Sequence, residues 1–387
     1  MTRPTIGVAV IGLGWMGHAH TRAYLRAGHH FPQLDHEPVL VAAADPEPGR
    51  ARDAGQRYGF ATATDDWTRL LRDERIQAVS VTVPNFLHRE IAGAFAEAGR
   101  HIWVEKPVGL TVADARAVAG AVAAAGVRGL VGFNYRAVPA VAHAHKLIAD
   151  GGIGAVTHAR FRFFSDYAAH PQGALSWRFT RSHGGNGVLG DLASHAVDLV
   201  RYLLGDIETL VADTAVFIPS RPRPGAAASH FARGTGEAGE VENEDFVGCL
   251  LRLPGGGRVV LEACRVSVGE QNTYGFEVHG TRGALAWDFR RMGELAVSLG
   301  TDYQDQSYQR VFVGPGHGEF GAFQPGAGIG MGYDDLKVIE AVGFLRGIAD
   351  GSPCGPTLDD AVAAATLLDA MAVSARDGTW VRIGAGS

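Results

Sequence analysis

The sequence predicts an α/β protein of two domains, with a doubly wound parallel sheet in the first and an antiparallel sheet in the second. Apolar segments of strand type alternate with helical segments as far as residue 133, which is the pattern of parallel strands covered by helices. From Ile153 onward, strand-like segments follow one another across short glycine-rich turns, which is typical of antiparallel hairpins. The chain has 387 residues, enough for two hydrophobic cores. We therefore expect domains at residues 1–133 and 134–387.

The composition favours a soluble globular enzyme, because 46% of the residues are hydrophobic and 20% are charged. The formal net charge is −6 and no block of lysines and arginines occurs, which argues against nucleic acid or an anionic membrane as the main partner. No apolar run reaches the roughly 20 residues of a membrane span. The N-terminus leads into a strand without a signal-peptide pattern. The three cysteines, Cys249, Cys264 and Cys354, are scattered without metal-binding spacing, so we expect reduced thiols in a cytoplasm and no metal.

The first strand runs directly into a glycine turn. Ile6–Ile11 is an apolar run, and the GLGWMG sequence of residues 12–17 separates it from a helical segment. Gly12 allows a tight turn, Gly14 lets a pyrophosphate approach the backbone, and Gly17 lets helix and strand pack closely. The N-terminus of the helix offers free N–H groups and a partial positive charge to phosphates. This arrangement predicts dinucleotide binding, with a plain glycine turn in a parallel sheet as the alternative.

The second strand ends at an acidic residue. Gly28–Pro38 is polar and is expected to form a longer connection, after which Val39–Ala44 forms the strand and Asp45 follows it. A carboxylate at this place accepts hydrogen bonds from the adenosine ribose and repels a 2′-phosphate, so Asp45 favours NAD over NADP. Arg50 is close enough in sequence to accommodate that phosphate instead. The alternative for Asp45 is a simple turn residue before Pro46.

Three further strands of the first domain are followed by polar tracts. Ligands bind outside the carboxyl ends of parallel strands, so these tracts should border one crevice. Helical segments are expected at Arg89–Ala98 and Val112–Ala125. The strands and their tracts are Ala78–Val83 with Pro84–His88, His101–Val104 with Glu105–Pro107, and Leu130–Phe133 with Asn134–Arg136.

The second domain opens with a strand at Val156–Phe164, where Arg160 and Arg162 alternate with phenylalanines as in a sheet with one buried face. Another strand is expected at Ile207–Ile218. Two hairpins follow, so the sheet should be antiparallel. Their strands are Phe246–Leu253 with Arg258–Val268, and Tyr274–His279 with Ala284–Phe289.

Two glycine-rich segments interrupt the second domain. Ser220–Glu240 is typical of a mobile surface loop. Gly314–Gly332 is too long for a tight turn and is either an active-site lid or a connecting loop. Near the end of the chain, Thr357 and Asp360 have the spacing of a capping box, and Gly378 is expected to end the last helix.

A glycine run at residues 184–190 leads into a segment that carries Asp191, His195 and Asp198. The spacing i, i+4, i+7 places the three on one helical face. The neighbouring stripe should belong to the core. An ordinary surface pair of Asp191 and His195 is one alternative, and a divalent metal on all three residues is another. The residues of the stripe are Leu192, Ala196, Leu199 and Leu203.

Four features resemble the glucose–fructose oxidoreductase/inositol dehydrogenase/MocA family over essentially the whole chain: GLGWMG, VPNFLH at Val83–His88, the Glu105-Lys106-Pro107 triplet, and Asp191 with His195 four residues later. The resemblance implies a Rossmann domain followed by an α/β domain with a large open antiparallel sheet. It also implies NAD(P)-dependent oxidation of sugars or cyclitols, and a homo-oligomer that packs through that sheet. Within the family, Ser176–Phe179 and the long second domain resemble the levoglucosan, inositol and L-glucose dehydrogenases.

Oxidation of a secondary alcohol with NAD needs a base for the hydroxyl proton and positive charge near the developing alkoxide. His195 suits the base, because an imidazole titrates near the working pH. Lys106 suits the electrostatic role, and Asp191 can orient the sugar or His195. The resemblance places Lys106, Asp191 and His195 in these positions, and whether Lys106 or His195 takes the proton stays open.

Other side chains are candidates for binding. Asn85 and His88 either touch the cofactor, as the resemblance implies, or cap the next helix. Trp177 either offers a stacking surface or is a buried anchor. His18 and His20 are expected to pack or cap. The predicted substrate contacts are Lys106, Tyr135, Asp191 and His195. The predicted cofactor contacts are Gly12, Gly14, Trp15, Met16, Gly17, Asp45, Pro84, Asn85, His88, Glu105, Lys106, Asn134, Trp177 and Arg178.

The sequence therefore predicts an NAD-dependent dehydrogenase of a secondary hydroxyl on a sugar, an anhydro-sugar or a cyclitol. One alternative is a glycoside-cleaving enzyme that keeps NAD bound and oxidises its substrate only transiently. A non-catalytic protein that senses a nucleotide or a sugar is the other alternative, and it is weakened by the presence of Lys106, Asp191 and His195.

Overall fold

The computed structural model describes residues 3–47, 49–225, 232–353 and 355–384. The chain divides into two compact units, Met1–Ala137 with Met331–Val362, and Val138–Gly330 with Ala363–Ser387. The first unit is therefore completed by a later segment that carries α8 (Tyr333–Asp350) and the start of α9 (Leu358–Asp377). The sequence pattern had suggested a single boundary at residues 133/134, because hydrophobic periodicity does not show to which core a helix returns.

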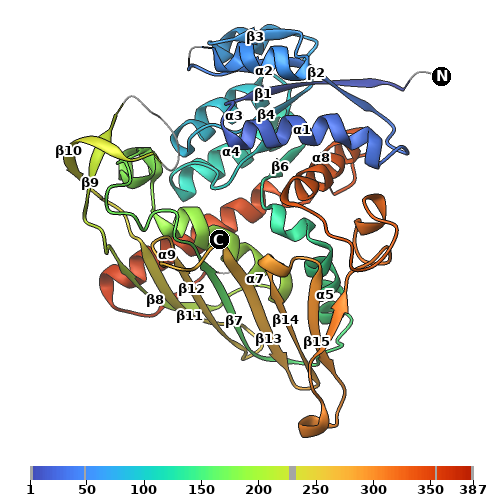
Figure 1. Cartoon of the computed structure of the whole chain (residues 1–387), viewed down its shortest axis with the longest axis vertical. Helices are drawn as coiled ribbons and strands as arrows, with labels where there is room; N and C mark the ends of the chain where they lie inside the picture. The colour runs from blue at the N-terminus through green and yellow to red at the C-terminus, as the bar shows by residue number, and fades with distance from the viewer. Residues whose placement is uncertain (1–2, 48, 226–231, 354, 385–387) are drawn as a thin grey trace. The chain divides into compact units, whose positions relative to one another are not determined.

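The first unit contains a six-stranded parallel sheet in the order β3-β2-β1-β4-β5-β6 (Figure 1). The strand order reverses between β1 and β4, which is where ligands bind in such sheets. Helix α1 packs on β1, β2 and α8, and α3 packs on α4. The predicted doubly wound sheet is confirmed. The elements are β1 (Thr5–Ile11), α1 (Trp15–His30), β2 (Glu37–Ala44), α2 (Arg50–Tyr58), β3 (Thr62–Thr64), β4 (Ala78–Val81), α3 (His88–Glu97), β5 (His101–Val104), α4 (Val112–Ala125) and β6 (Gly129–Val131).

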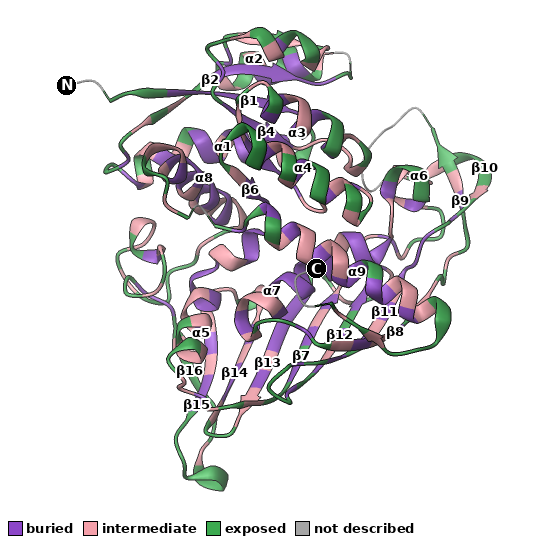
Figure 2. Cartoon of the chain, turned by 180° about the vertical axis from the view of Figure 1, so that it is seen from behind, coloured by how far each residue is buried: buried purple, intermediate pink, exposed green. Residues whose placement is uncertain are grey.

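The main differences in this unit are at its polar edge. Helix α1 continues to His30 and β2 begins at Glu37, so the connection is shorter than Gly28–Pro38. Helix α2 and the three-residue strand β3 were not predicted. Only Ala51 and Ala54 of α2 are buried, so this short and mostly polar helix offers few apolar residues by which it could be recognised. Central strands such as β1 and β4 are buried along nearly their whole length, which made them easy to recognise (Figure 2).

The second unit contains a nine-stranded sheet in the order β16-β15-β14-β13-β7-β12-β11-β8-β17. The predicted hairpins form and the sheet is largely antiparallel as expected, except that β7 and β12 run parallel. Hairpin turns fix only the pairing of consecutive strands, whereas β7 inserts between two hairpins. The strands are β7 (Val156–Phe164), β8 (Thr209–Ala215), β11 (Phe246–Arg252), β12 (Arg258–Cys264), β13 (Thr273–Gly280), β14 (Gly283–Asp288), β15 (Glu294–Leu299), β16 (Gln309–Phe312) and β17 (Val381–Arg382).

One face of this sheet is covered by helices, and residues along β11 alternate between buried and more exposed (Figure 2). Helices α5 and α7 pack on that face, with the π-helical turn η5 between the glycine run and α7. The helical elements are α5 (Pro139–Ala149), α6 (Arg181–Gly184), η5 (Leu189–Ala193) and α7 (Ser194–Leu204). Short 3₁₀ turns lie at Trp67–Arg72 (η1), Asn85–Leu87 (η2), Asn134–Ala137 (η3), Trp177–Phe179 (η4), Phe289–Arg291 (η6), Tyr303–Asp305 (η7) and Phe320–Ala322 (η8).

The segment Ser220–Glu240 is not simply a loop. Its described residues form a two-stranded antiparallel sheet of β9 (Ser220–Pro224) and β10 (Gly234–Glu240), while residues 226–231 lie outside the described residues. The expectation of a surface loop is therefore wrong for both ends of the segment. Few apolar residues mark these strands, because they pair with each other instead of joining the large sheet.

The second glycine-rich segment packs on its own unit as far as residue 330. Phe320 is 1% exposed, and the His317 ring lies 4.3 Å from the ring of His143 in α5, measured between centroids. These contacts favour the interpretation of Gly314–Gly332 as a packed connecting loop. Its alternative role as an active-site lid stays a prediction.

Three remaining expectations concern single residues. The capping box of the last helix forms, because Thr357 N–H donates to Asp360 and Asp360 N–H donates to Thr357 Oγ1, and Gly378 follows the helix with φ +63°. Cys249 and Cys264 are buried free thiols, and Cys354 lies outside the described residues. Within the described part of the chain, no helix is both long and apolar enough to cross a membrane.

Candidate active site

The glycine turn between β1 and α1 is closely packed on one side and open on the other. Gly12 has φ +93°, and a Cβ on Gly17 would lie 2.0 Å from Gly12 O, so both glycines are required. A Cβ on Gly14 would meet no atom within 4 Å. No side chain caps α1, and its first turn holds no acidic residue, so no cap side chain satisfies its first N–H groups. The turn therefore fits a dinucleotide pyrophosphate.

Asp45 fastens the end of β2 to this glycine turn. Its Oδ2 accepts a 2.6 Å hydrogen bond from Leu13 N–H, and its Oδ1 accepts a 2.9 Å hydrogen bond from Glu47 N–H. Arg50 Nη1 lies 3.8 Å from Oδ1, so the two side chains form a loose ion pair. Each carboxylate oxygen retains a second lone pair, which leaves acceptors for ribose hydroxyls. Asp45 thus has a structural role in the turn in addition to the predicted contact.

The exposed start of α1 carries two predicted cofactor contacts. The Trp15 side chain is 65% exposed and stacks on Tyr333 of α8, with ring centroids 5.2 Å apart. Tyr333 Oη donates to Met16 Sδ at 3.8 Å. Both residues therefore meet α8, which the sequence pattern did not connect with the glycine turn.

His88 joins the loops that follow β4 and β5. Its Nδ1 lies 2.7 Å from Pro107 O and its Nε2 lies 2.8 Å from Val83 O. The residue is 1% exposed, and burial lowers the pKa of its imidazole. His88 is the first residue of α3 but its side chain does not cap the helix. Its cofactor contact, like those of Pro84 and Asn85, stays a prediction.

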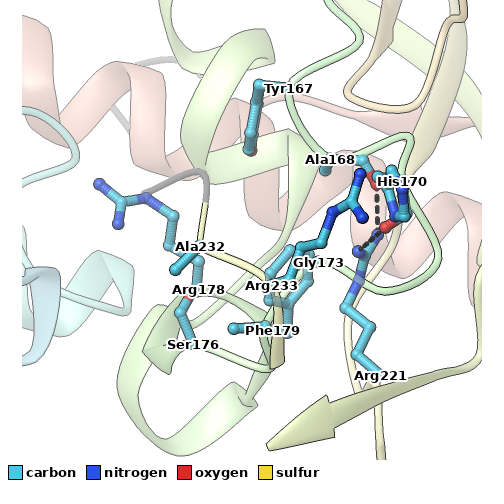
Figure 3. A pocket seen from close by; sticks show the side chains of 11 residues that line it. Tyr167, Ala168, His170, Gly173, Ser176, Arg178, Phe179, Arg221, Ala232 and Arg233 are labelled. Carbon is cyan, nitrogen blue, oxygen red and sulfur yellow. Dashed lines mark hydrogen bonds between the residues drawn. The ribbon is translucent and has the colours of Figure 1, made fainter. Parts of the chain in front are cut away.

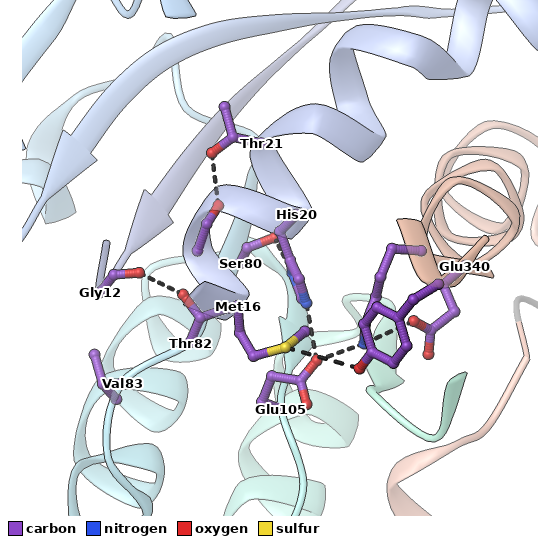
Figure 4. Close-up of polar contacts among 12 residues, drawn as sticks. Gly12, Met16, His20, Thr21, Ser80, Thr82, Val83, Glu105 and Glu340 are labelled. Carbon is purple, nitrogen blue, oxygen red and sulfur yellow. Dashed lines mark hydrogen bonds and ion pairs between the residues drawn. The ribbon is translucent and has the colours of Figure 1, made fainter. Parts of the chain in front are cut away.

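Glu105 is held inside the first unit by two basic side chains (Figure 4). Its Oε1 lies 2.9 Å from His20 Nε2 and 2.6 Å from Lys337 Nζ. Burial alone would raise the pKa of Glu105, but Lys337 and His20 together lower it far below its usual range. Lys337 also pairs with Glu340 at 2.8 Å, so the pKa of this lysine is raised although burial opposes its charge. The carboxylate of Glu105 anchors the end of β5 immediately before Lys106.

The same cluster explains His20. Its Nδ1 lies 3.1 Å from Ser80 Oγ and its ring stacks on Trp103, with centroids 3.7 Å apart. Burial is the main cause that lowers the pKa of His20 to about 4. His20 therefore packs in the interior, as expected, and its lowered pKa favours the neutral imidazole. A Cβ on Gly132 would lie 2.5 Å from Glu105 Oε1, which accounts for a glycine after β6.

Lys106, Asn134 and Tyr135 lie at the carboxyl ends of β5 and β6. Lys106 is half-buried, whereas Asn134 and Tyr135 are 1% and 7% exposed. Asn134 Nδ2 is buried and has no hydrogen-bond partner among the described residues. A buried donor without a partner costs stability unless a ligand accepts from it, so Asn134 fits a carbonyl acceptor such as a carboxamide.

In the second unit, Asp191 lies in the π-helical turn η5 and His195 lies in the first turn of α7. The expectation of one regular helix is therefore wrong here, because the glycine run permits a wider turn; π-helical turns are frequent at functional sites. Tyr167 Oη donates to Asp191 Oδ2. Burial, and then the charge of Asp191, raises the pKa of the Tyr167 phenol. Tyr167 thus fixes the orientation of Asp191.

His195 is 7% exposed and lies beside two aromatic rings. The centroids of Phe163 and Tyr274 are 6.1 Å and 6.4 Å from that of His195. Tyr274 Oη donates to His195 O at 2.8 Å and fixes the backbone. Asp198 is buried at 3% exposure. The predicted core stripe of Leu192, Ala196, Leu199 and Leu203 is confirmed by its burial.

The glycine run before Asp191 is shaped by Glu244. A Cβ on Gly187 would lie 2.2 Å from Glu244 O, and Leu189 N–H donates to Glu244 Oε1 at 3.1 Å. Trp177 is half-buried in η4, so it is not a fully buried anchor, and the Arg178 guanidinium lies 4.3 Å above its ring. The described residues contain no group of three or more His, Cys, Asp or Glu that could hold a metal ion.

Comparison with known proteins supports one family for both units. Residues 6–133 match the model of the GFO/IDH/MocA oxidoreductase family with an NAD-binding Rossmann fold, and residues 141–286 match the C-terminal domain of the same family. The chain belongs to the GFO/IDH/MocA family. The predicted resemblance, fold class and NAD-binding character are thereby confirmed.

Several members of the GFO/IDH/MocA family are similar along nearly their whole length. Levoglucosan dehydrogenase from Pseudarthrobacter phenanthrenivorans is 37% identical, with 98% of each chain covered. Inositol 2-dehydrogenase from Rhizobium meliloti is 26% identical over 95% of this chain and 96% of the relative. The structure of a levoglucosan dehydrogenase in complex with NADH and levoglucosan has a TM-score of 0.92 at 36% identity, covering 98% of this chain and 99% of that one.

The family motifs led sequence reasoning to Lys106, Asp191 and His195 but not to the side chains that hold their neighbours. Lys337 and Tyr167 were missed because each is far in sequence from the carboxylate it contacts. A signal for Lys337 does exist: it and Glu340 are charged residues three positions apart in an otherwise apolar part of α8. No comparable pattern marks Tyr167.

Proposed function

We propose that this chain is an NAD-dependent dehydrogenase that oxidises a secondary hydroxyl of a sugar, an anhydro-sugar or a cyclitol. The observation that carries the proposal is the combination of an open glycine turn with Lys106 directly after the anchored Glu105. Relatives that are named as levoglucosan and inositol dehydrogenases support the substrate class.

The residues divide into a binding group and a reacting group. The turn at Gly12, Gly14 and Gly17 would bind the pyrophosphate, Asp45 the adenosine ribose, and Asn134 the carboxamide. NAD, when bound, supplies the hydride acceptor.

The reacting group is Lys106, Asp191 and His195. The Lys106 ammonium would hydrogen-bond the reacting oxygen and stabilise the alkoxide that develops on it. His195 would take the hydroxyl proton, and Asp191, oriented by Tyr167, would hold a neighbouring hydroxyl.

The experiment is a screen for NADH formation over inositols, aldoses and anhydro-sugars, with NAD and NADP compared on every active substrate. We expect NAD to be preferred, because the Asp45 carboxylate repels a 2′-phosphate. Lys106→Met should lower kcat by about 10²-fold, the effect of losing one donor to an oxyanion, and should leave NAD affinity nearly unchanged.

Three results would contradict the proposal. Product without net NADH would indicate a glycoside-cleaving enzyme, and binding without turnover would indicate a sensor. A Lys106→Met variant that turns over normally would remove Lys106 from the reacting group.

We also propose a cytoplasmic homo-oligomer that associates through the nine-stranded sheet. Several large apolar side chains of its strands are exposed, among them Leu250 and Phe312, each at 50%. Light scattering on the purified protein should give a mass of two or more chains, and Leu250→Glu should shift it towards the mass of one chain. A mass of one chain for the wild type at micromolar concentration would contradict the association.

A further inference from the structure

A cavity of about 220 Å³ lies in the second unit, between the segment 167–179, Arg221 of β9, and Ala232 and Arg233, which directly precede β10 (Figure 3). Three backbone hydrogen bonds fix its walls: Ala174 N–H to Ala232 O, Gly234 N–H to Gln172 O, and Leu175 N–H to Pro222 O, at 2.8–3.0 Å. A cavity of this size is below the range of pockets for larger ligands, so it suits one sugar ring or a smaller molecule and not a dinucleotide.

The lining of this cavity is strongly basic. Arg178, Arg221 and Arg233 line it, and no aspartate or glutamate is among the described residues that do. None of the three guanidinium groups has a carboxylate at ion-pair distance in the part of the chain that the structure describes. Burial lowers the pKa of Arg221 and the charge of Asp245 opposes this lowering, but the two side chains form no ion pair, so the three guanidinium groups retain positive charge that attracts an anion.

Arg221 brings a buried and incompletely hydrogen-bonded guanidinium to the wall of the cavity. It is 1% exposed, and its two Nη atoms donate to His170 O at 3.0 Å and Ala168 O at 2.5 Å. Its Nε is buried and lacks a hydrogen-bond partner among the described residues. Burial lowers the pKa of Arg221, which reflects the free-energy cost of a charge removed from water.

A neighbouring arginine provides the contrast. Arg221 and Arg265 both lie over the ring of Phe179, with Cζ to centroid distances of 4.3 Å and 4.6 Å. Arg265 Nε donates to Asp245 Oδ1 at 2.8 Å, whereas Arg221 has only carbonyl oxygens as acceptors. Buried charges are normally paired, so the unpaired guanidinium on the cavity wall is the one that requires explanation.

The cavity lies next to a predicted catalytic residue. The Tyr167 side chain lines it, and Tyr167 Oη donates to Asp191 Oδ2. We propose that this cavity binds an oxyanion carried by the substrate, so that the preferred substrate is an acidic polyol with a carboxylate or a phosphate group. This inference rests on the proposed dehydrogenase function and narrows its substrate class. Arginine suits the task because its planar donors match the oxygens of both groups.

The test compares matched ligands at saturating NAD: glucuronate and glucose 6-phosphate against glucose. Isothermal titration calorimetry measures their binding, and NADH formation measures their turnover. The diagnostic variant is Arg233→Gln, because this side chain is exposed and its loss should not disturb folding. Arg221→Lys keeps the buried charge and removes the Nε donor. The control is Arg116→Gln, the same change on the exposed face of α4.

We expect at least one acidic ligand to bind and turn over at least 10-fold better than glucose. Arg233→Gln should weaken its binding by roughly 10-fold or more, which is the usual effect of losing a charge-assisted hydrogen bond, and Arg116→Gln should not. Preference for glucuronate would identify a carboxylate as the bound group, and preference for glucose 6-phosphate would identify a phosphate.

Equal binding of the acidic and neutral ligands would overturn the inference, and so would acidic ligands that bind without being oxidised while neutral polyols turn over. Failure of every polyol to reduce NAD would instead reject the proposed function. In that case, binding of the acidic ligands that weakens in Arg233→Gln would still support an oxyanion site in the cavity.

Discussion

Each unit holds a carboxylate among the predicted site residues: Glu105 directly precedes Lys106 in the first unit, and Asp191 is itself a predicted catalytic residue of the second. The two carboxylates are held in different ways. Glu105 is 7% exposed, and its carboxylate is stabilised by a hydrogen bond with His20 and an ion pair with Lys337. Asp191 is half-buried and accepts from a neutral phenol, that of Tyr167. The first arrangement fixes a strand end, and the second orients the carboxylate that we propose as a contact for a substrate hydroxyl. This comparison gives Glu105 a structural role, and it is consistent with the proposal that Asp191 contacts the substrate.

The largest effect that tests this division is expected at His195. His195→Ala should lower kcat by roughly 10²- to 10⁴-fold, because it removes the proposed general base. In the wild type, the rate of oxidation should rise with pH through one ionisation. In the variant, this pH-dependent rise in rate should be absent. Initial rates of NADH formation between pH 5 and pH 10 measure both effects. His29→Ala, at an exposed position near the end of α1, is the control and should behave like the wild type. A pH-dependent rise that persists in His195→Ala would assign the proton to Lys106 or to a water.

The second prediction concerns the stability of the first unit, where Lys337 pairs with Glu105 and Glu340. Lys337→Met leaves Glu105 and Glu340 buried without their shared cation, so we expect the free energy of unfolding to fall by about 3–5 kcal/mol. Lys146→Met, which removes an exposed lysine paired with Asp150, should cost less than about 1 kcal/mol. Urea unfolding of the two variants measures the difference. Equal costs would mean that the Glu105 cluster is not the structural anchor described above.

The third prediction is that burial of neutral His20 makes the folded protein less stable as the pH is lowered. The pKa of His20 is about 4 in the folded state and has an ordinary value of 6.5. Between these values the unfolded chain binds the proton and the folded chain does not, so stability falls as the pH is lowered from 6.5 to 4. The contribution of His20 is about 3 kcal/mol over this range. In His20→Gln, the loss of stability between pH 7 and pH 4.5, measured by urea midpoints, should be smaller. The same slope in both proteins would contradict a neutral buried His20.

The prediction of the fold succeeded where local pattern and packing agree. Strands buried on both faces, such as β1 and β4, are apolar along their length, and β7 was predicted with its observed bounds. The polar helix α2 and the small β9–β10 sheet were missed, because these elements contain few buried apolar residues. The direction of β7 relative to β12 could not be predicted, since no turn links these strands.

The sequence by itself determined the glycine turn, because Gly12 and Gly17 meet close backbone contacts that only glycine allows. It also determined that Lys106 follows a strand end and that Asp191 precedes His195 by four residues. Only the tertiary structure decided how these residues are held: Lys337 reaches Glu105 across 232 positions, Tyr167 reaches Asp191, and Arg221 lies buried without a carboxylate partner. The physical reason is that the pKa and the hydrogen bonds of a buried group depend on the groups that surround it in place of water. Those groups come together only when distant segments pack.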